Sequence, residues 1–127
     1  MEKSYIPEGF MEVTPCISVK DADKCIEFLV DVLEGKLIAR YADENDRIMN
    51  AIVRIGASTI ELSDANEQWP ARPAACHVYV PDVDAAYERA LKAGAKSLGA
   101  PTDKHYGERG AELEDEFGNH WYIATVK

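Results

Sequence analysis

At 127 residues, the chain is long enough for one domain with an ordinary core, and its 46% apolar and 29% charged residues are typical of globular proteins. A net charge of −9 without a basic stripe excludes the phosphate contacts on which nucleic-acid binding depends. No stretch reaches the ~18 apolar residues of a membrane helix, and the N-terminus lacks a signal-peptide pattern, so we expect a cytoplasmic protein that does not enter a membrane. Three cysteines at spacings that match no metal or disulfide framework predict reduced thiols.

The first half of the chain predicts one strand, one helix and three further strands. Alternating apolar residues from Val13 to Val19 predict a strand that Pro15 restricts to an edge or a start. Asp21 can cap the next helix, whose apolar stripe ends at Leu33, and Gly35 is expected to end it in the left-handed conformation. The remaining strands are predicted at Leu37–Tyr41, Ile48–Ile55 and Thr59–Ser63, and a loop follows over 64–73.

The second half predicts the same order of elements. Asp82 is the expected cap of a second helix, which Gly94 ends. A loop is expected over 105–110, and a turn around Gly118 leads into the last strand, in which bulky residues alternate between two faces. The strands are predicted at Ala75–Val80, Lys96–Leu98, Ala111–Glu114 and Asn119–Val126.

The two halves are also related in sequence. Val19–Asp23 matches Val80–Asp84 at a separation of 61 residues, and Ile60–Leu62 matches Trp121–Ile123 at the same separation. An internal repeat of this kind indicates two similar supersecondary units. We therefore predict an α+β fold in which residues 1–127 form a single domain of two βαβββ repeats, 12–63 and 75–126.

Several motifs in this order resemble the vicinal oxygen chelate superfamily, which includes glyoxalase I, bleomycin-resistance proteins, fosfomycin-resistance enzymes and extradiol dioxygenases. The resemblance covers 12–126. Its motifs are Pro15–Asp23, Tyr79–Ala86, Arg89–Ala95, Tyr106–Arg109 and Asp115–Trp121. The last two motifs are similar to the PhnB-like branch, with Glu116 in place of a usual proline.

The resemblance implies a curled, mixed sheet that forms a cup, with the helices outside. In the family's enzymes the cup holds a divalent metal, and the four ligand positions fall at Thr14, Glu61, Ala75 and Tyr122 in this sequence. Only Glu61 is an ordinary ligand, and a useful site needs at least three good donors. We therefore predict no metal and no other cofactor. A displaced site that combines Glu61, His77 and His120 is a less favoured alternative, because each histidine is two residues from its family position.

Strand alternation predicts which side chains line the cup. The lining mixes aromatic rings, hydroxyls, imidazoles and one carboxylate, which favours a polar or aromatic ligand over a lipid. Its predicted members are Thr14, Cys16, Ser18, Thr59, Glu61, Ala75, His77, Tyr79, His120 and Tyr122.

The side chains of Glu61, Arg109 and Trp69 each allow more than one role. Glu61 is the only candidate for a catalytic residue; it can act as a general base, pair with a cationic ligand, or accept a hydrogen bond from the lining. Arg109 can bind an anionic group at the cup mouth, or pair with the acidic run 112–116. Trp69 can stack on a ligand or on a partner chain, and Cys16 lacks a neighbouring base that would activate it.

Two functions of different kinds are consistent with this reading. The first is a metal-free protein that binds a small polar or aromatic molecule, including a cationic antibiotic, as in the bleomycin-resistance branch. Its expected binding residues are Cys16, Thr59, Glu61, His77, Tyr79, Arg109, His120 and Tyr122. The second is a glyoxalase-like lyase or isomerase, or a dioxygenase-like enzyme, that uses Glu61 with or without a divalent metal. In both cases the resemblance implies a homodimer.

Overall fold

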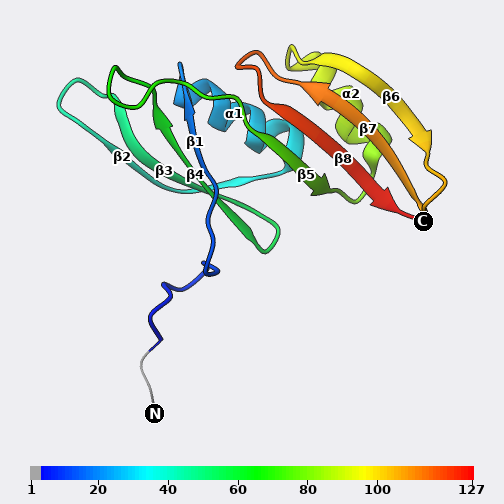
Figure 1. The fold of residues 1–127 in the computed structure, drawn as a ribbon, viewed down its shortest axis with the longest axis horizontal. Coiled ribbons are helices and arrows are strands. Elements are labelled where there is room, and N and C mark those ends of the chain that lie inside the picture. Colours follow the sequence, from blue (N-terminus) through cyan, green and yellow to red (C-terminus); the bar gives the residue numbers. More distant parts are fainter. Residues whose placement is uncertain (1–3) are drawn as a thin grey trace. The chain divides into compact units, whose positions relative to one another are not determined.

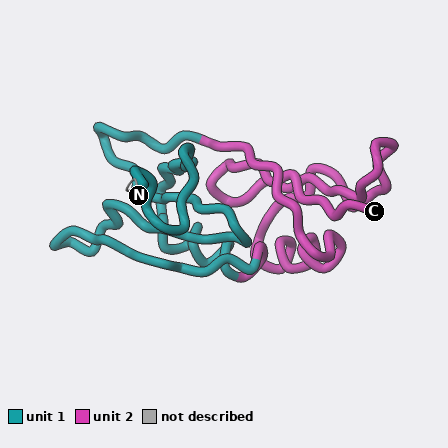
Figure 2. Tube along the Cα trace, turned by 90° about the horizontal axis from the view of Figure 1, so that it is seen from below, with its two compact units in different colours: residues 1–30, 34–72 teal, residues 31–33, 73–127 magenta. Residues whose placement is uncertain are grey.

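The structure is a computed structural model that describes residues 4–127, which form two helices and eight strands (Figure 1). The chain divides into two compact units, Met1–Val30 with Glu34–Arg72, and Asp31–Leu33 with Pro73–Lys127 (Figure 2). No helix among the described residues is long and apolar enough to span a membrane. The elements are β1 Cys16–Val19, α1 Ala22–Leu33, β2 Lys36–Ala42, β3 Ile48–Ile55, β4 Ser58–Asp64, β5 Ala75–Tyr79, α2 Val83–Lys92, β6 Lys96–Asp103, β7 Glu108–Glu114 and β8 His120–Val126.

Unit 1 contains a four-stranded sheet in the order β1-β4-β3-β2, in which β1 runs parallel to β4 and the other pairs are antiparallel. Period-two alternation buries the apolar side chains of one face, such as Val19, Val53 and Leu62. The opposite face carries polar residues, among them Cys16 and Glu61, which are direct neighbours across β1 and β4. This second face is open and offers side chains for binding.

The helix α1 begins as the sequence predicts, but a different residue ends it. Asp21 accepts a hydrogen bond from the backbone N–H of Lys24, as expected of a cap. At the other end, Glu34 takes the left-handed conformation (φ 58°), so the assignment of that role to Gly35 is wrong. Gly35 is required for space instead, because a Cβ there would lie 3.0 Å from both the Leu29 carbonyl oxygen and Cγ1 of Val53.

Unit 2 repeats this architecture with the order β5-β8-β7-β6, again with the first pair parallel. The helix α2 contacts β6, β7 and β8. Its buried Ala86 and Ala90, together with Leu113, Trp121 and Ile123 from the sheet, form the apolar core of this unit. The α+β class and the two βαβββ repeats are therefore confirmed; each sheet is open, with two free edges.

The repeat extends to individual contacts. Cys16 pairs with Glu61 in unit 1, and the residues 61 positions later, His77 and Tyr122, pair in unit 2. In each unit, the backbone N–H of the first helical residue also donates to a side-chain oxygen near the end of the strand that comes last in sequence, β4 or β8. Asp64 Oδ1 accepts from Ala22 N at 2.8 Å in unit 1, and Thr125 Oγ1 accepts from Val83 N at 3.0 Å in unit 2.

An arginine binds the first-turn aspartate of each helix, but it comes from a different strand in each unit. Arg40 of β2 donates to both carboxylate oxygens of Asp23, at 2.9 and 2.8 Å. Arg109 of β7 makes the same two-point contact with Asp84, at 2.8 and 2.9 Å. The hydrogen bonds from the arginines hold the pKa of both carboxyl groups below the ordinary value.

Three predicted strand boundaries differ from the structure by more than one residue. β1 begins at Cys16 rather than Val13, since Pro15 has no N–H; its carbonyl accepts from Glu61 N instead. β6 continues to Asp103 rather than stopping at Leu98, and it does so through two register shifts. β7 begins at Glu108, so residues 108–110 belong to a strand and not to the predicted loop.

The turn between β7 and β8 is fixed by one buried carboxylate. Asp115, which is 4% exposed, accepts from the backbone N–H groups of Phe117 and Asn119 through Oδ1, both at 2.9 Å. Its Oδ2 accepts from Asn119 Nδ2 at 3.0 Å and from Trp121 Nε1 at 2.9 Å. Asn119 in turn accepts from Ala74 N at 2.9 Å, which attaches the segment before β5 to the turn.

Asp115→Ala is predicted to destabilise the protein by about 3 kcal/mol or more, because buried donors of Trp121 and Asn119 lose their acceptor. Glu44→Ala, which removes an exposed carboxylate from the β2–β3 turn, should change the free energy of unfolding by less than about 0.5 kcal/mol. Urea denaturation followed by tryptophan fluorescence measures both. Equal stability of the two variants would show that Asp115 does not hold the turn.

Candidate functional site

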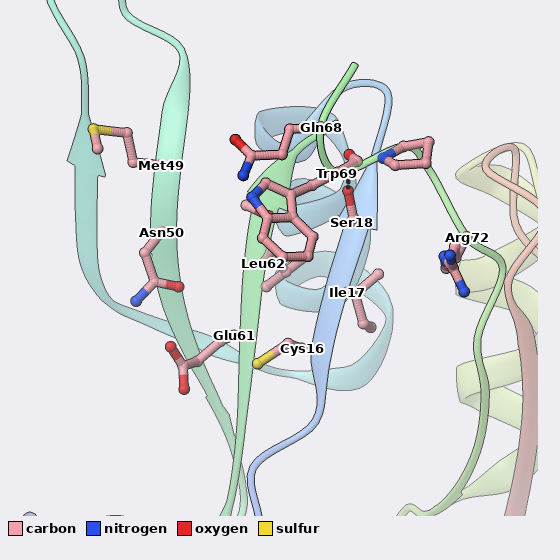
Figure 3. A pocket seen from close by; sticks show the side chains of 12 residues that line it. Cys16, Ile17, Ser18, Met49, Asn50, Glu61, Leu62, Gln68, Trp69 and Arg72 are labelled. Atoms are coloured by element: carbon pink, nitrogen blue, oxygen red, sulfur yellow. Dashed lines mark hydrogen bonds between the residues drawn. The ribbon is translucent and has the colours of Figure 1, made fainter. Parts of the chain in front are cut away.

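A cavity of unit 1 lies on the open face of its sheet and has a volume of about 700 Å³ (Figure 3). Strands β1, β3 and β4 form its floor, and the loop after β4 forms one side. Its lining residues are Cys16, Ile17, Ser18, Met49, Asn50, Glu61, Leu62, Ser63, Gln68, Trp69, Pro70 and Arg72. The size is within the range of small-molecule sites, about 300–1,000 Å³.

Trp69 lines this cavity. Its side chain is large and apolar, yet 64% of the residue is exposed. Its backbone is held in place by a tight turn: Trp69 N donates to Asn66 Oδ1 at 2.8 Å, and Asn66 N donates to the Trp69 carbonyl at 2.9 Å. The hydroxyl of Ser18 donates to the same carbonyl at 3.2 Å, as Figure 3 shows. The backbone that carries the indole ring is therefore held in place before any ligand arrives.

Glu61 projects from β4 into the same cavity, near Cys16 and Asn50 (Figure 3). No side chain among the described residues donates a hydrogen bond to its carboxylate or forms an ion pair with it. Burial, and secondarily the charge of Glu61, raises the pKa of the Cys16 thiol. Cys16 therefore stays protonated at neutral pH, in agreement with its predicted lack of nucleophilic character.

Thr59, another predicted binding residue, lies on the same strand as Glu61 but is covered. It is 7% exposed, and its hydroxyl donates to the carbonyl of Gly9 at 2.6 Å. The N-terminal segment therefore covers this end of the open face. Gly9 has a positive φ of 84°, and its α-carbon lies so close to the guanidinium of Arg54 that a Cβ has no space.

The predicted histidines and tyrosines lie on the open face of unit 2, where His77, Tyr79 and His120 are paired with glutamates. His77 Nε2 lies 3.3 Å from Glu108 Oε2, and the Tyr79 hydroxyl donates to Glu108 Oε1 at 3.1 Å. His120 Nε2 lies 2.9 Å from Glu114 Oε1. His120 thus makes a hydrogen-bonding contact with Glu114, and the role of both histidines in lining a binding site stays a prediction.

A cavity of about 150 Å³ in unit 2 includes His77, Glu108 and Tyr122. There Lys104 extends over Gly110 to place Nζ 3.1 Å from Glu112 Oε1, and a Cβ on Gly110 would lie 3.4 Å from Cε of that lysine. Glu112 is therefore paired with Lys104, and Glu108 accepts a hydrogen bond from the Tyr79 hydroxyl.

Sequence reasoning missed the glutamates of β7. Glu108, Glu112 and Glu114 share one face of β7, as their partners Val126, Tyr122 and His120 share one face of β8. The signal was available in their even spacing, but it was hidden because the strand was expected to start at Ala111.

Arg109 points to the opposite face of β7 from these glutamates. It binds Asp84, and its Nη1 lies 3.3 Å from Asp103 Oδ1. The alternative pairing with the acidic run 112–116 is not formed, because strand alternation directs the side chain toward the first turn of α2.

The donor set at the family's metal positions does not fit a metal ion. Ala75 has no donor atom, and Thr14 and Tyr122 offer only hydroxyl oxygens, which leaves Glu61 as the one ordinary ligand. Among residues 4–127, no group of three or more histidine, cysteine, aspartate or glutamate side chains is arranged to hold an ion.

Comparison with known proteins places this geometry in a family. The family model described as the glyoxalase/bleomycin resistance protein/dioxygenase superfamily matches residues 12–123. An uncharacterised protein of Mycobacterium bovis is 31% identical, over 87% of this chain and 80% of its own length.

Solved structures share the fold at lower identity. TioX from Micromonospora has a TM-score of 0.74 at 22% identity, covering 92% of this chain and 97% of its own. TnmS3, an antibiotic-binding protein from Streptomyces, has a TM-score of 0.68 at 21% identity, covering 92% and 98%. The fosfomycin resistance protein FosX from Mesorhizobium loti has a TM-score of 0.66 at 16% identity, covering 93% and 95%. Since the family model matches most of the chain, the protein belongs to the glyoxalase/bleomycin resistance protein/dioxygenase superfamily.

Proposed function

We propose that the protein binds a planar aromatic molecule carrying a positive charge, without a metal, in the unit 1 cavity. The observation that carries this proposal is that one cavity of about 700 Å³ contains an exposed indole and a carboxylate that receives no hydrogen bond from the described side chains. Trp69 supplies a flat apolar surface, and Glu61 supplies the charge.

The chemistry of the two groups favours this ligand class. An exposed indole gains free energy when a flat ring covers it, and it also attracts cations through its ring face. The Glu61 carboxylate receives no hydrogen bond from the described side chains, so a cation that meets it replaces only water. Arg72 is the only basic residue in the lining, and the chain has a net charge of −9. The local and overall charge both favour a cation.

The relatives are consistent with the proposal. One structural neighbour is named as an antibiotic-binding protein and another as a fosfomycin resistance protein. We carry over to this chain only the idea that the fold can hold a small molecule, and the ligand class rests on Trp69 and Glu61. The PhnB-like branch stays a prediction from Asp115–Trp121.

Glu61→Gln is predicted to weaken binding of 9-aminoacridine, a planar cation, by about tenfold, and to leave binding of the neutral planar acridone unchanged. Trp69→Leu should weaken both by at least about tenfold, because both rings stack on the indole. Isothermal titration calorimetry measures the affinities.

The matched control is Glu67→Gln, which removes the same charge from an exposed residue of the same loop that does not line the cavity. It should bind both compounds like the parent protein. If Glu67→Gln and Glu61→Gln lose equal affinity, the effect is one of net charge and the assigned role of Glu61 is wrong. If neither compound binds the parent protein, the proposed function is wrong.

Protein purified without chelators is predicted to contain only substoichiometric metal, since the family positions supply one ordinary ligand. Elemental analysis by mass spectrometry tests this, with EDTA treatment expected to leave acridine binding unchanged. One equivalent of nickel, zinc, manganese or iron per chain, lost on Glu61→Gln, would instead support the alternative of a glyoxalase-like or dioxygenase-like enzyme.

We also propose that residues 1–127 act as one domain of two repeats, in a cytoplasmic homodimer. Both sheets have unpaired edge strands, and the three cysteines are free. Size-exclusion chromatography with light scattering should give twice the mass of the 14.1 kDa chain at micromolar concentration. A stable mass of one chain would contradict the dimer.

A further inference from the structure

A second cavity of about 380 Å³ adjoins the proposed binding cavity in unit 1. Four residues line both cavities, namely Met49, Ser63, Gln68 and Trp69. The two cavities are therefore adjacent at these side chains, and the smaller space lies next to a ligand that stacks on Trp69. That space is large enough for a substantial chemical group.

The smaller cavity differs from the larger one in its chemistry. Asp43 and Asp64 bring two negative charges to its lining, and Arg47 brings one positive charge. Several of its polar atoms already have partners: both oxygens of Asp64 accept backbone N–H groups, and Asn66 Oδ1 accepts from Trp69.

The remaining polar groups form a mixed set of donors and acceptors. Arg47 Nη2 donates to the Ala65 carbonyl at 2.8 Å, which leaves its other donors. Asp43 Oδ1 accepts from two backbone N–H groups, which leaves Oδ2. No side-chain hydrogen bond joins the Gln68 amide or the Ser63 hydroxyl to another described residue.

Hydroxyl groups suit this set better than charged groups do. A hydroxyl donates one hydrogen bond and accepts others, so it can pair with either kind of free group. A charged appendage of either sign would meet at least one side chain of its own sign, because the lining carries both aspartates and an arginine. An apolar appendage would leave the donors and acceptors without water.

We propose that the natural ligand has two parts, a planar aromatic body that stacks on Trp69 and a hydroxylated appendage, such as a sugar or polyol, that occupies the smaller cavity. This inference rests on the proposed function, because it assumes that the aromatic body binds in the larger cavity. It adds the chemical class of the second part and assigns Arg47 and Gln68 to its recognition.

Three acridines test the appendage: 9-aminoacridine, the same ring with an N-linked glucamine chain, and the same ring with an N-linked hexyl chain. The glucamine compound should bind at least about tenfold more tightly than 9-aminoacridine, from several added hydrogen bonds. The hexyl compound, of similar length, should show no such gain. Fluorescence titration of the acridine measures all three affinities.

Two arginine variants locate the effect. Arg47 lines only the smaller cavity and Arg72 only the larger one. Arg47→Met should remove most of the glucamine gain and leave 9-aminoacridine unchanged, whereas Arg72→Met should leave the gain intact. Gln68→Met is a second variant that should reduce the gain, and melting temperatures confirm that each variant is folded.

The outcomes separate the two proposals. If 9-aminoacridine binds and the glucamine and hexyl compounds bind equally well, the hydroxylated appendage is wrong and the proposed function stands. If Arg47→Met and Arg72→Met weaken the glucamine compound alike, the assignment to the smaller cavity is wrong. If no acridine binds, the proposed function fails, and the inference fails with it.

Discussion

The fold of the second half depends on the buried carboxylate of Asp115. Four hydrogen bonds converge on it, two from the backbone of its own turn and two from the side chains of Asn119 and Trp121. A buried carboxylate is costly unless its oxygens are satisfied, so the turn, the orientation of the indole and the start of β8 are fixed together. Trp121 then fills the core, while its neighbours His120 and Tyr122 face the open side.

The two units use the same scaffold for different surfaces. Cys16 and Glu61 in unit 1 correspond by position to His77 and Tyr122 in unit 2. In unit 2, histidine, tyrosine and lysine side chains meet the glutamates of β7. In unit 1 no described side chain donates a hydrogen bond to Glu61, and Trp69 lines the same cavity. The binding chemistry we propose therefore arises from a carboxylate of unit 1 that lacks the side-chain partners which the glutamates of β7 have in unit 2.

The sequence was sufficient to predict the order of elements, the repeat and the faces of most strands, since these follow from local periodicity and capping residues such as Asp21 and Asp82. It placed Glu61 on the open face correctly. It could not show that Gly9 covers Thr59 or that Lys104 spans Gly110, because both depend on segments that meet only after folding. The sequence also predicts Trp69 as a possible stacking group, but the position of its backbone depends on a hydrogen bond from Ser18, which lies 51 residues away.

The arginine pairs at the two helices bear on how the halves diverged. The aspartate is retained at equivalent positions, where a negative charge suits the helix N-terminus, but its cation comes from β2 in one half and β7 in the other. Each repeat thus has its own local source of charge compensation. A substitution that removes Arg40 therefore breaks the pair in unit 1 and leaves the Arg109–Asp84 pair of unit 2 intact.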